Sequence, residues 1–193
     1  MLGRIVVTST VAVLGLCTCF AAQAAARGSV TPHTGSEEIA CPGAGAMIVD
    51  EAARLRAAAT LLCLVNRRRA AAGVRALRAS APLTAAAAQH SSAMVARHFF
   101  GHAGAAGLRR RVVRAGYVRP DQIATLGETL AWGAGTMATP AQLMDAFTES
   151  RAHRRTLLYE RFRDAGVGIT LGAPLPGAGG GPAATVTVDF GRR

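Results

Sequence analysis

The chain has 193 residues and a formal net charge of +11, with 22 arginines, no lysine and 11 acidic residues. This length is sufficient for one domain of ordinary size that buries a hydrophobic core, and it is short for two domains. The charge comes without a recognition helix, an aromatic stacking sheet or a zinc finger, so the sequence does not indicate specific nucleic-acid binding. The arginine-only composition is most simply explained by the codon bias of a GC-rich genome. The charge still favours anionic cell-wall polymers or lipid head groups as partners.

Residues 1–26 have the pattern of a signal peptide. Arg4 supplies the positive charge, residues 5–20 are largely apolar, and residues 22–26 offer small side chains for cleavage. The apolar stretch is short for a membrane span, although a retained anchor is the alternative interpretation. No later segment is long and apolar enough to cross a bilayer. We therefore expect a mature protein that is secreted or associated with the cell wall and is not transmembrane.

An irregular arm, rich in proline and glycine, is predicted over residues 27–46, before a domain over residues 47–193. After removal of the leader, the only cysteines are Cys41 and Cys63. Because an exported protein matures in an oxidising compartment, we expect these two to form a disulfide. Two free, buried thiols are the alternative.

Three helices are predicted in the first half of the domain. The first follows a capping Asp50 and stops at Gly73, the second starts at Ser80-Ala81-Pro82, and a short third ends at Gly116. The inner stripe predicted for the first helix is Leu55, Ala58, Ala59, Leu62, Val65 and Asn66. The arginine runs 67–69 and 109–111 are predicted to lie on solvated faces. Within the second helix, His90 is predicted to be a core histidine that is hydrogen-bonded locally.

The second half alternates strands with one further helix. A strand is predicted over Thr125–Ala131, and a helix starts at Thr139-Pro140 and ends near Ser150. Two final strands, over 166–171 and 185–190, flank a connector rich in proline and glycine, which should be a long, flexible hairpin loop. This order of helices and strands predicts an α+β fold.

Three residues from separate segments carry the candidate chemistry: His102, Glu128 and His153. Two imidazoles and a carboxylate suit Zn²⁺ or another divalent metal with an open coordination position, or could hold a water for acid–base work. The chain contains no H-E-x-x-H element and no G-x-S-x-G elbow. Three hypotheses therefore stay open: a polar network without catalysis, a metal or ligand site, and a hydrolytic centre.

Several short motifs appear in a fixed order around this trio. They are L-C-L-V-N-R-R-R-A-A-A-G-V (62–74), A-A-A-A-Q-H-S-S-A-M (85–94), F-F-G-H (99–102), G-E-T-L-A-W-G (127–133), S-R-A-H-R-R-T-L-L (150–158), A-G-V-G-I (165–169) and V-D-F-G (188–191). In this order they resemble the CAP superfamily of cysteine-rich secretory, antigen 5 and pathogenesis-related proteins, in its bacterial secreted, SCP-like branch. The resemblance covers about residues 55–191. It implies a three-layer α-β-α sandwich.

The resemblance also implies a cleft lined by two histidines and two acidic residues. His102, Glu128 and His153 match three of these positions, and Ser150 stands where the second glutamate is usual, as in other bacterial members. Relatives in this family are linked to sterol and lipid binding. We therefore expect a secreted binding or interaction module that takes a divalent metal or a lipid-like ligand. The alternative is a metal-dependent hydrolase acting on cell wall or peptide.

Overall fold

The computed structural model describes residues 40–177 and 181–193. The predicted signal peptide (1–26) and most of the predicted arm (27–46) lie outside these residues. The helices are α1 (Glu51–Ala71), α2 (Ala81–Ala96), α3 (Gly104–Arg114), α4 (Pro140–Glu149) and α5 (Arg151–Leu157), with a 3₁₀ turn, η1, at Gly135–Met137. The strands are β1 (Arg78–Ala79), β2 (Thr125–Ala134), β3 (Asp164–Leu171) and β4 (Ala183–Arg192). None of the helices in the described part is long and apolar enough to cross a bilayer.

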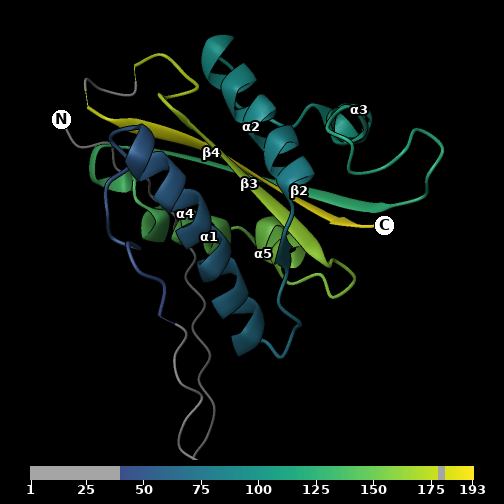
Figure 1. Cartoon of the computed structure of the whole chain (residues 1–193). Coiled ribbons are helices and arrows are strands. Elements are labelled where there is room, and N and C mark those ends of the chain that lie inside the picture. The colour runs from purple at the N-terminus through teal and green to yellow at the C-terminus, as the bar shows by residue number, and fades with distance from the viewer. Residues whose placement is uncertain (1–39, 178–180) are drawn as a thin grey trace, which may run out of the picture. The chain divides into compact units, whose positions relative to one another are not determined.

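The strands form one sheet in the order β1-β3-β4-β2. The long strands pair antiparallel, and β1 adds a short parallel edge to β3. Helices α2 and α3 cover one face of the sheet, and α1, α4 and α5 cover the other (Figure 1). This is the three-layer α-β-α arrangement of an α+β fold, so the predicted fold class is confirmed.

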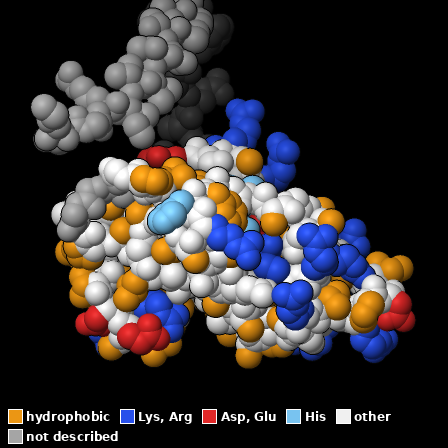
Figure 2. Space-filling view, turned by 90° about the horizontal axis from the view of Figure 1, so that it is seen from above, with side chains coloured by type: hydrophobic (Ala, Val, Ile, Leu, Met, Phe, Trp, Pro, Cys, Tyr) orange, Lys and Arg blue, Asp and Glu red, His pale blue; other side chains and the backbone are white. Residues whose placement is uncertain are grey.

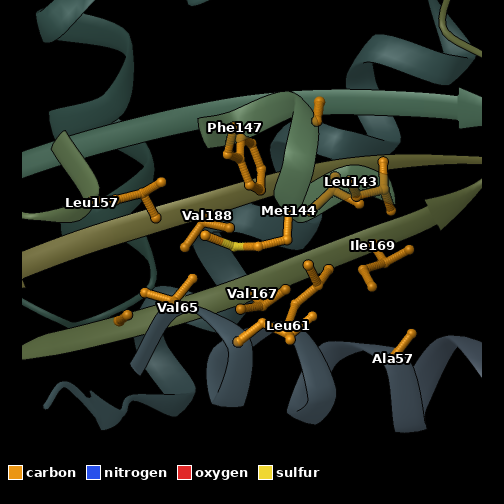
Figure 3. Packing of buried hydrophobic residues seen from close by; sticks show 14 of the residues in the cluster. Ala57, Leu61, Val65, Leu143, Met144, Phe147, Leu157, Val167, Ile169 and Val188 are labelled. Atoms are coloured by element: carbon orange, nitrogen blue, oxygen red, sulfur yellow. The ribbon is translucent and has the colours of Figure 1, made fainter. Parts of the chain in front are cut away.

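The main core lies between the sheet and the layer of α1, α4 and α5. Its apolar side chains come from the helices and from the sheet. Figure 3 shows Leu61 of α1, Phe147 of α4 and Val188 of β4 among them. On β4, alternate residues point into this core, which places Thr187 and Asp189 on the opposite face, toward α2 and α3. The two faces of β4 therefore differ in chemistry: one is apolar and the other carries buried polar groups.

Helix α2 packs unusually close to the sheet because glycines on β3 leave room for its backbone. A Cβ at Gly166 would lie 2.0 Å from the backbone nitrogen of Thr84, and one at Gly168 would lie 2.1 Å from that of Ala88. At this short range the Ser91 hydroxyl donates to the carbonyl of Gly168 (2.9 Å). The A-G-V-G-I motif thus sets the distance between α2 and the sheet. It thereby also sets the position of His90, which lies on α2.

The ends of the helices follow the predicted capping signals, whereas the buried face of α1 does not follow the predicted stripe. The Asp50 carboxylate accepts from the amide of Ala53 (2.7 Å), as expected for an N-cap. However, Leu55 is 59% exposed, and the helix is buried along Ala57, Leu61 and neighbouring positions. The prediction for Leu55 is wrong because many alanines make the apolar contrast around this helix weak.

The predicted disulfide is present. The sulfurs of Cys41 and Cys63 are bonded, with the two Cα atoms 5.7 Å apart, so the end of the arm is fixed to α1. The Thr60 hydroxyl adds a second tie by donating to the carbonyl of Pro42 (2.8 Å). Three elements were not predicted: the short edge strand β1, the 3₁₀ turn η1 and helix α5.

Candidate functional site

The site centres on the carboxylate of Glu128, in the middle of β2. Its side chain is only 5% exposed. One oxygen accepts a hydrogen bond from Nδ1 of His102 (2.8 Å), and the other accepts from the guanidinium of Arg111. Both oxygens of this buried carboxylate are therefore engaged, one by an imidazole and one by a cation.

Arg111 comes from α3, and the prediction that it is solvated is wrong. Its side chain is 11% exposed, because α3 turns Leu108 and Val112 toward the sheet and Arg111 shares their face of the helix. The sequence signal for this placement was the spacing of three residues between Leu108 and Arg111, which puts both on one side of a helix. Arg111 thus supplies the positive charge that makes burial of Glu128 tolerable.

His102 is the part of the site that faces solvent. Its side chain is half exposed, and its Nδ1 is held by Glu128. With the proton on Nδ1, the lone pair of Nε2 is left available, and Nε2 has no partner in the described part of the chain. Glu128 therefore acts on His102 as an orienting group that fixes the tautomer and the direction of the ring.

His90 supports the loop that carries His102. Its Nε2 lies 3.1 Å from the carbonyl of Gly101, the residue before His102, and 3.9 Å from Oε1 of Glu128. Burial lowers the pKa of His90, so the neutral ring donates to that carbonyl. The prediction that His90 is a locally satisfied core histidine is confirmed.

Asp189 is a member of the site that the sequence did not reveal. It lies directly opposite Glu128 on β4 and is fully buried. Neither of its oxygens receives a hydrogen bond from a described side chain. Burial first, and the negative charge of Glu128 second, raise the pKa of Asp189, which favours its protonated form. The carboxyl groups of Glu128 and Asp189 are thus neighbours in the interior of the protein.

The remaining predicted residues, His153 and Ser150, lie in and before α5. Ser150 caps this helix, and its hydroxyl accepts from the amide of His153 (3.3 Å). The His153 ring packs edge-on against Phe147, with centroids 5.8 Å apart, and its Nδ1 is buried without a partner in the described part of the chain. Burial, and next the charge of His102, lower the pKa of His153. His153 therefore borders the site as a neutral ring, outside the hydrogen bonds of Glu128.

These positions do not fit a preformed metal centre. Within residues 40–177 and 181–193, no three histidine, cysteine or acidic side chains are grouped closely enough to hold a metal ion. The donors that a metal would need are also committed, because Glu128 is ion-paired to Arg111. Zinc binding by His102, His153 and Glu128 stays a prediction, and it would require these side chains to rearrange.

A separate, mostly apolar cavity lies between α1 and the residues that follow the disulfide. Its volume is about 460 Å³. Met47, Ala53 and Ala57 contribute apolar surface, and Arg56 is the single charged residue in the lining. Its chemistry differs from that of the His102 site, which is polar throughout.

Comparisons with known proteins agree on the fold. The chain is similar to an extracellular protein with an SCP domain from Bacillus anthracis (TM-score 0.55, 22% identity, covering 73% of this chain and 42% of that one). It is also similar to a cysteine-rich secretory protein from Staphylococcus aureus (TM-score 0.53, 14% identity, 72% and 39% covered). A third similar structure is an outer surface protein from Borrelia burgdorferi (TM-score 0.51, 16% identity, 69% and 90% covered).

The chain spans about two fifths of the length of the first two of these structures. No curated protein sequence matches it. The sequence nevertheless matches the family described as the cysteine-rich secretory protein family, CAP, over residues 62–179, which is more than half of the chain. Together with the α-β-α sandwich, this match shows that the chain belongs to the CAP family.

Proposed function

We propose that this protein is an exported CAP domain that acts by binding. Export is supported by the signal-peptide pattern at residues 1–26, by the Cys41–Cys63 disulfide and by the extracellular or surface origin of similar structures. The binding role rests on the site itself.

One observation carries the proposal: the Glu128 carboxylate is fully engaged. Its two oxygens accept from His102 and Arg111, and its side chain is buried. A general base must reach the proton that it removes, and an ion-paired carboxylate beneath a histidine cannot do so without breaking these bonds. The site therefore offers a fixed polar group to a ligand, with Nε2 of His102 as the exposed acceptor.

The proposed ligands are of two kinds. At the cleft, a ligand with a hydrogen-bond donor, or a divalent metal such as zinc after rearrangement of the trio, would be bound by His102 and by His153 beside it. At the apolar cavity, Met47 and the alanines of α1 provide surface for a lipid-like ligand, with Arg56 available to a negatively charged group.

The basic surface supports a third part of the proposal, attraction to anionic cell-wall polymers or anionic lipids. Figure 2 looks down on the side of α2 and α3 and shows arginines crowded on the half of this face that carries α3. Arg110 and Arg114 on α3, and Arg119 after it, are exposed. Attraction of this kind acts at long range and is weakened by salt.

Sedimentation with purified anionic cell-wall material tests this function. The bound fraction should fall steeply between low and physiological salt, and it should be the same for the parent and for His102→Ala/His153→Ala. The variant Arg110→Gln/Arg114→Gln should bind less at every salt concentration. Binding that ignores salt, or that Arg110→Gln/Arg114→Gln leaves unchanged, would contradict this part of the proposal. Loss of binding with the two histidines would place the polymer at the His102 site instead of the basic surface.

A metal-dependent hydrolase of cell wall or peptide is the second candidate. The observation in its favour is that a carboxylate orients His102 so that Nε2 is free, as second-shell carboxylates do for metal-binding histidines. This candidate makes the opposite prediction for the trio, because its activity would disappear with His102 and His153.

A further inference from the structure

At the opposite edge of the sheet from Glu128, several arginines gather around a small polar cavity. The cavity has a volume of about 130 Å³ and is lined by Arg75, Ala76, Arg78 and Arg163. Arg75 and Arg78 flank the edge strand β1, and Arg163 immediately precedes β3. Since β1 and β2 are the two outer strands, this cavity is separate from the His102 site.

The positive charge here is not balanced by the protein. In the described part of the chain, Asp164 is the only carboxylate that forms an ion pair with any of the lining arginines, through Arg78 (2.9 Å). Its second oxygen accepts from the hydroxyl of Tyr117 (2.8 Å), so each oxygen of Asp164 already has a partner, and neither Arg75 nor Arg163 is among them. Three arginines therefore line the cavity, and only Arg78 is paired with a carboxylate.

A fourth arginine lies buried behind the loop that carries Arg75. Arg69 is fully buried, and its Nε donates to the carbonyl of Arg75 (2.8 Å). Its Nη1 donates to the carbonyls of Leu157 and Tyr159, while its Nη2 is buried without a partner in the described part. Burial first, and then the charge of Arg163, lower the pKa of Arg69. The cation is thus held by carbonyl dipoles alone, close enough to Arg163 to repel it.

The lining arginines still have donors to offer. The side chain of Arg75 makes no hydrogen bond or ion pair with the described residues, whereas Arg163 uses Nη1 for the carbonyls of Glu160 and Phe162. An arginine fork suits the oxygens of a phosphate group, and two or more forks can hold one tetrahedral anion. The cavity has room for such a group, because its volume equals that of about four water molecules in the liquid.

We infer that the cavity formed by Arg75, Arg78 and Arg163 is a binding site for a phosphate group, free or carried as an ester. Arg75 and Arg163 supply the free donors, and Arg78 stays fixed by Asp164. A bound anion also offsets the repulsion between Arg163 and Arg69. This site goes beyond the proposed function, since it is discrete, lies away from α3 and does not involve the cleft.

Titration of the ¹⁵N-labelled mature protein with inorganic phosphate, at constant ionic strength balanced with chloride, tests the site. We expect saturable shifts in the amides of residues 75–79 and 163–165. Arg75→Gln should weaken the apparent affinity at least about fivefold, as expected for loss of a charge-assisted contact of roughly 1 kcal/mol or more. It should fold normally, because the Arg75 side chain makes no bond in the described structure.

The matched control is Arg97→Gln, which removes the same charge from an exposed position at the C-terminal end of α2. It should change the affinity less than about twofold, since screened charges at a distance contribute little. Shifts that do not saturate, or equal weakening by the two variants, would overturn the inference by showing attraction to net charge alone. The outcome of this titration does not depend on whether the protein binds cell-wall material, so the phosphate site and the proposed function can fail separately.

Two further probes identify the source of the phosphate group. Binding of glycerol phosphate that depends on Arg75, without binding to phosphatidylglycerol vesicles, supports the site with a soluble or polymeric ester as ligand. Vesicle binding that depends on Arg75 supports the site with a lipid head group as ligand. If Arg75→Gln changes the binding of neither inorganic phosphate nor either ester, the inference of a phosphate site is overturned.

Discussion

Glu128 on β2 and Asp189 on β4 occupy opposite positions in the same antiparallel ladder, so that two carboxyl groups lie side by side beneath His102. Arg111 and His102 bond to Glu128, whereas no described donor reaches Asp189. The pair therefore keeps one ionised member, compensated by Arg111, and one member that burial favours in its protonated form.

Asp189 should make the stability of the fold depend on pH. Burial raises the pKa of Asp189 from 3.8 to about 8, so the folded protein binds more protons than the unfolded chain between these values. The free energy of unfolding should therefore fall as pH rises through this window. Urea denaturation at pH 5 and pH 8 should show a smaller fall for Asp189→Asn than for the parent.

Asp121→Asn is the control for that measurement, because the Asp121 side chain is 85% exposed. It should leave the difference between the two pH values as it is in the parent. If Asp189→Asn also leaves it unchanged, the account of the carboxyl pair is wrong. A change of one pKa unit corresponds to about 1.4 kcal/mol, so even part of the shift is measurable.

Arg111 should be important for stability, whereas its neighbour Arg110 should not. Arg111→Gln leaves the buried carboxylate of Glu128 without its cation, which we expect to cost about 3 kcal/mol in the free energy of unfolding. Arg110→Gln, at an exposed position on the same helix, should cost less than about 0.5 kcal/mol. Equal losses in chemical denaturation would contradict the ion pair.

A double-mutant cycle gives the coupling between the two partners of this ion pair. Adding Glu128→Gln to Arg111→Gln should cost less than the sum of the single changes, because the carboxylate is no longer buried without its partner. Additive losses would mean that Arg111 and Glu128 act independently.

The disulfide should contribute strongly to stability. Cys41 and Cys63 are 22 residues apart, and closure of a loop of this length gives about 3 kcal/mol on the chain-entropy estimate. Cys41→Ser/Cys63→Ser should lower the urea midpoint accordingly. Mass spectrometry of exported protein should show the two cysteines joined, and alkylation of both without reductant would contradict the bond.

Zinc binding at the cleft can be measured by calorimetry. If His102 and His153 bind Zn²⁺, His102→Ala/His153→Ala should abolish stoichiometric binding, and Glu128→Gln should weaken it less. Burial lowers the pKa of His153, which favours the neutral ring that a metal needs; affinity should fall once the pH is low enough to protonate the histidines. Undiminished binding by the double variant would place the metal elsewhere.

Local signals in the sequence predicted most of the fold. Asp50, Ser80 and Thr139 cap helices as expected, because a cap depends only on nearby residues. Asn66, which was predicted on the inner stripe of α1, forms hydrogen bonds to both backbone groups of Leu77 through its side-chain amide. Helix α5 was missed because a seven-residue, arginine-rich segment is helical only through its cap and its tertiary contacts.

The candidate site was harder to predict, since its chemistry depends on contacts between distant segments. His102 and Glu128 do meet, but the charge pattern placed Arg111 and Arg69 in solvent, whereas both are buried. Alternation along β4 put Asp189 on the face opposite Val188 without revealing that α2 closes over that face. Partners separated by many residues set burial and pKa, and no local pattern records them.

The central claim, that this CAP domain acts by binding, is tested most directly by assaying the release of soluble fragments from purified cell-wall material, with and without added zinc. We predict that the parent protein stays bound to the material and releases no more fragments than buffer does. Release by the parent that disappears in His102→Ala/His153→Ala would contradict this account and establish a hydrolase.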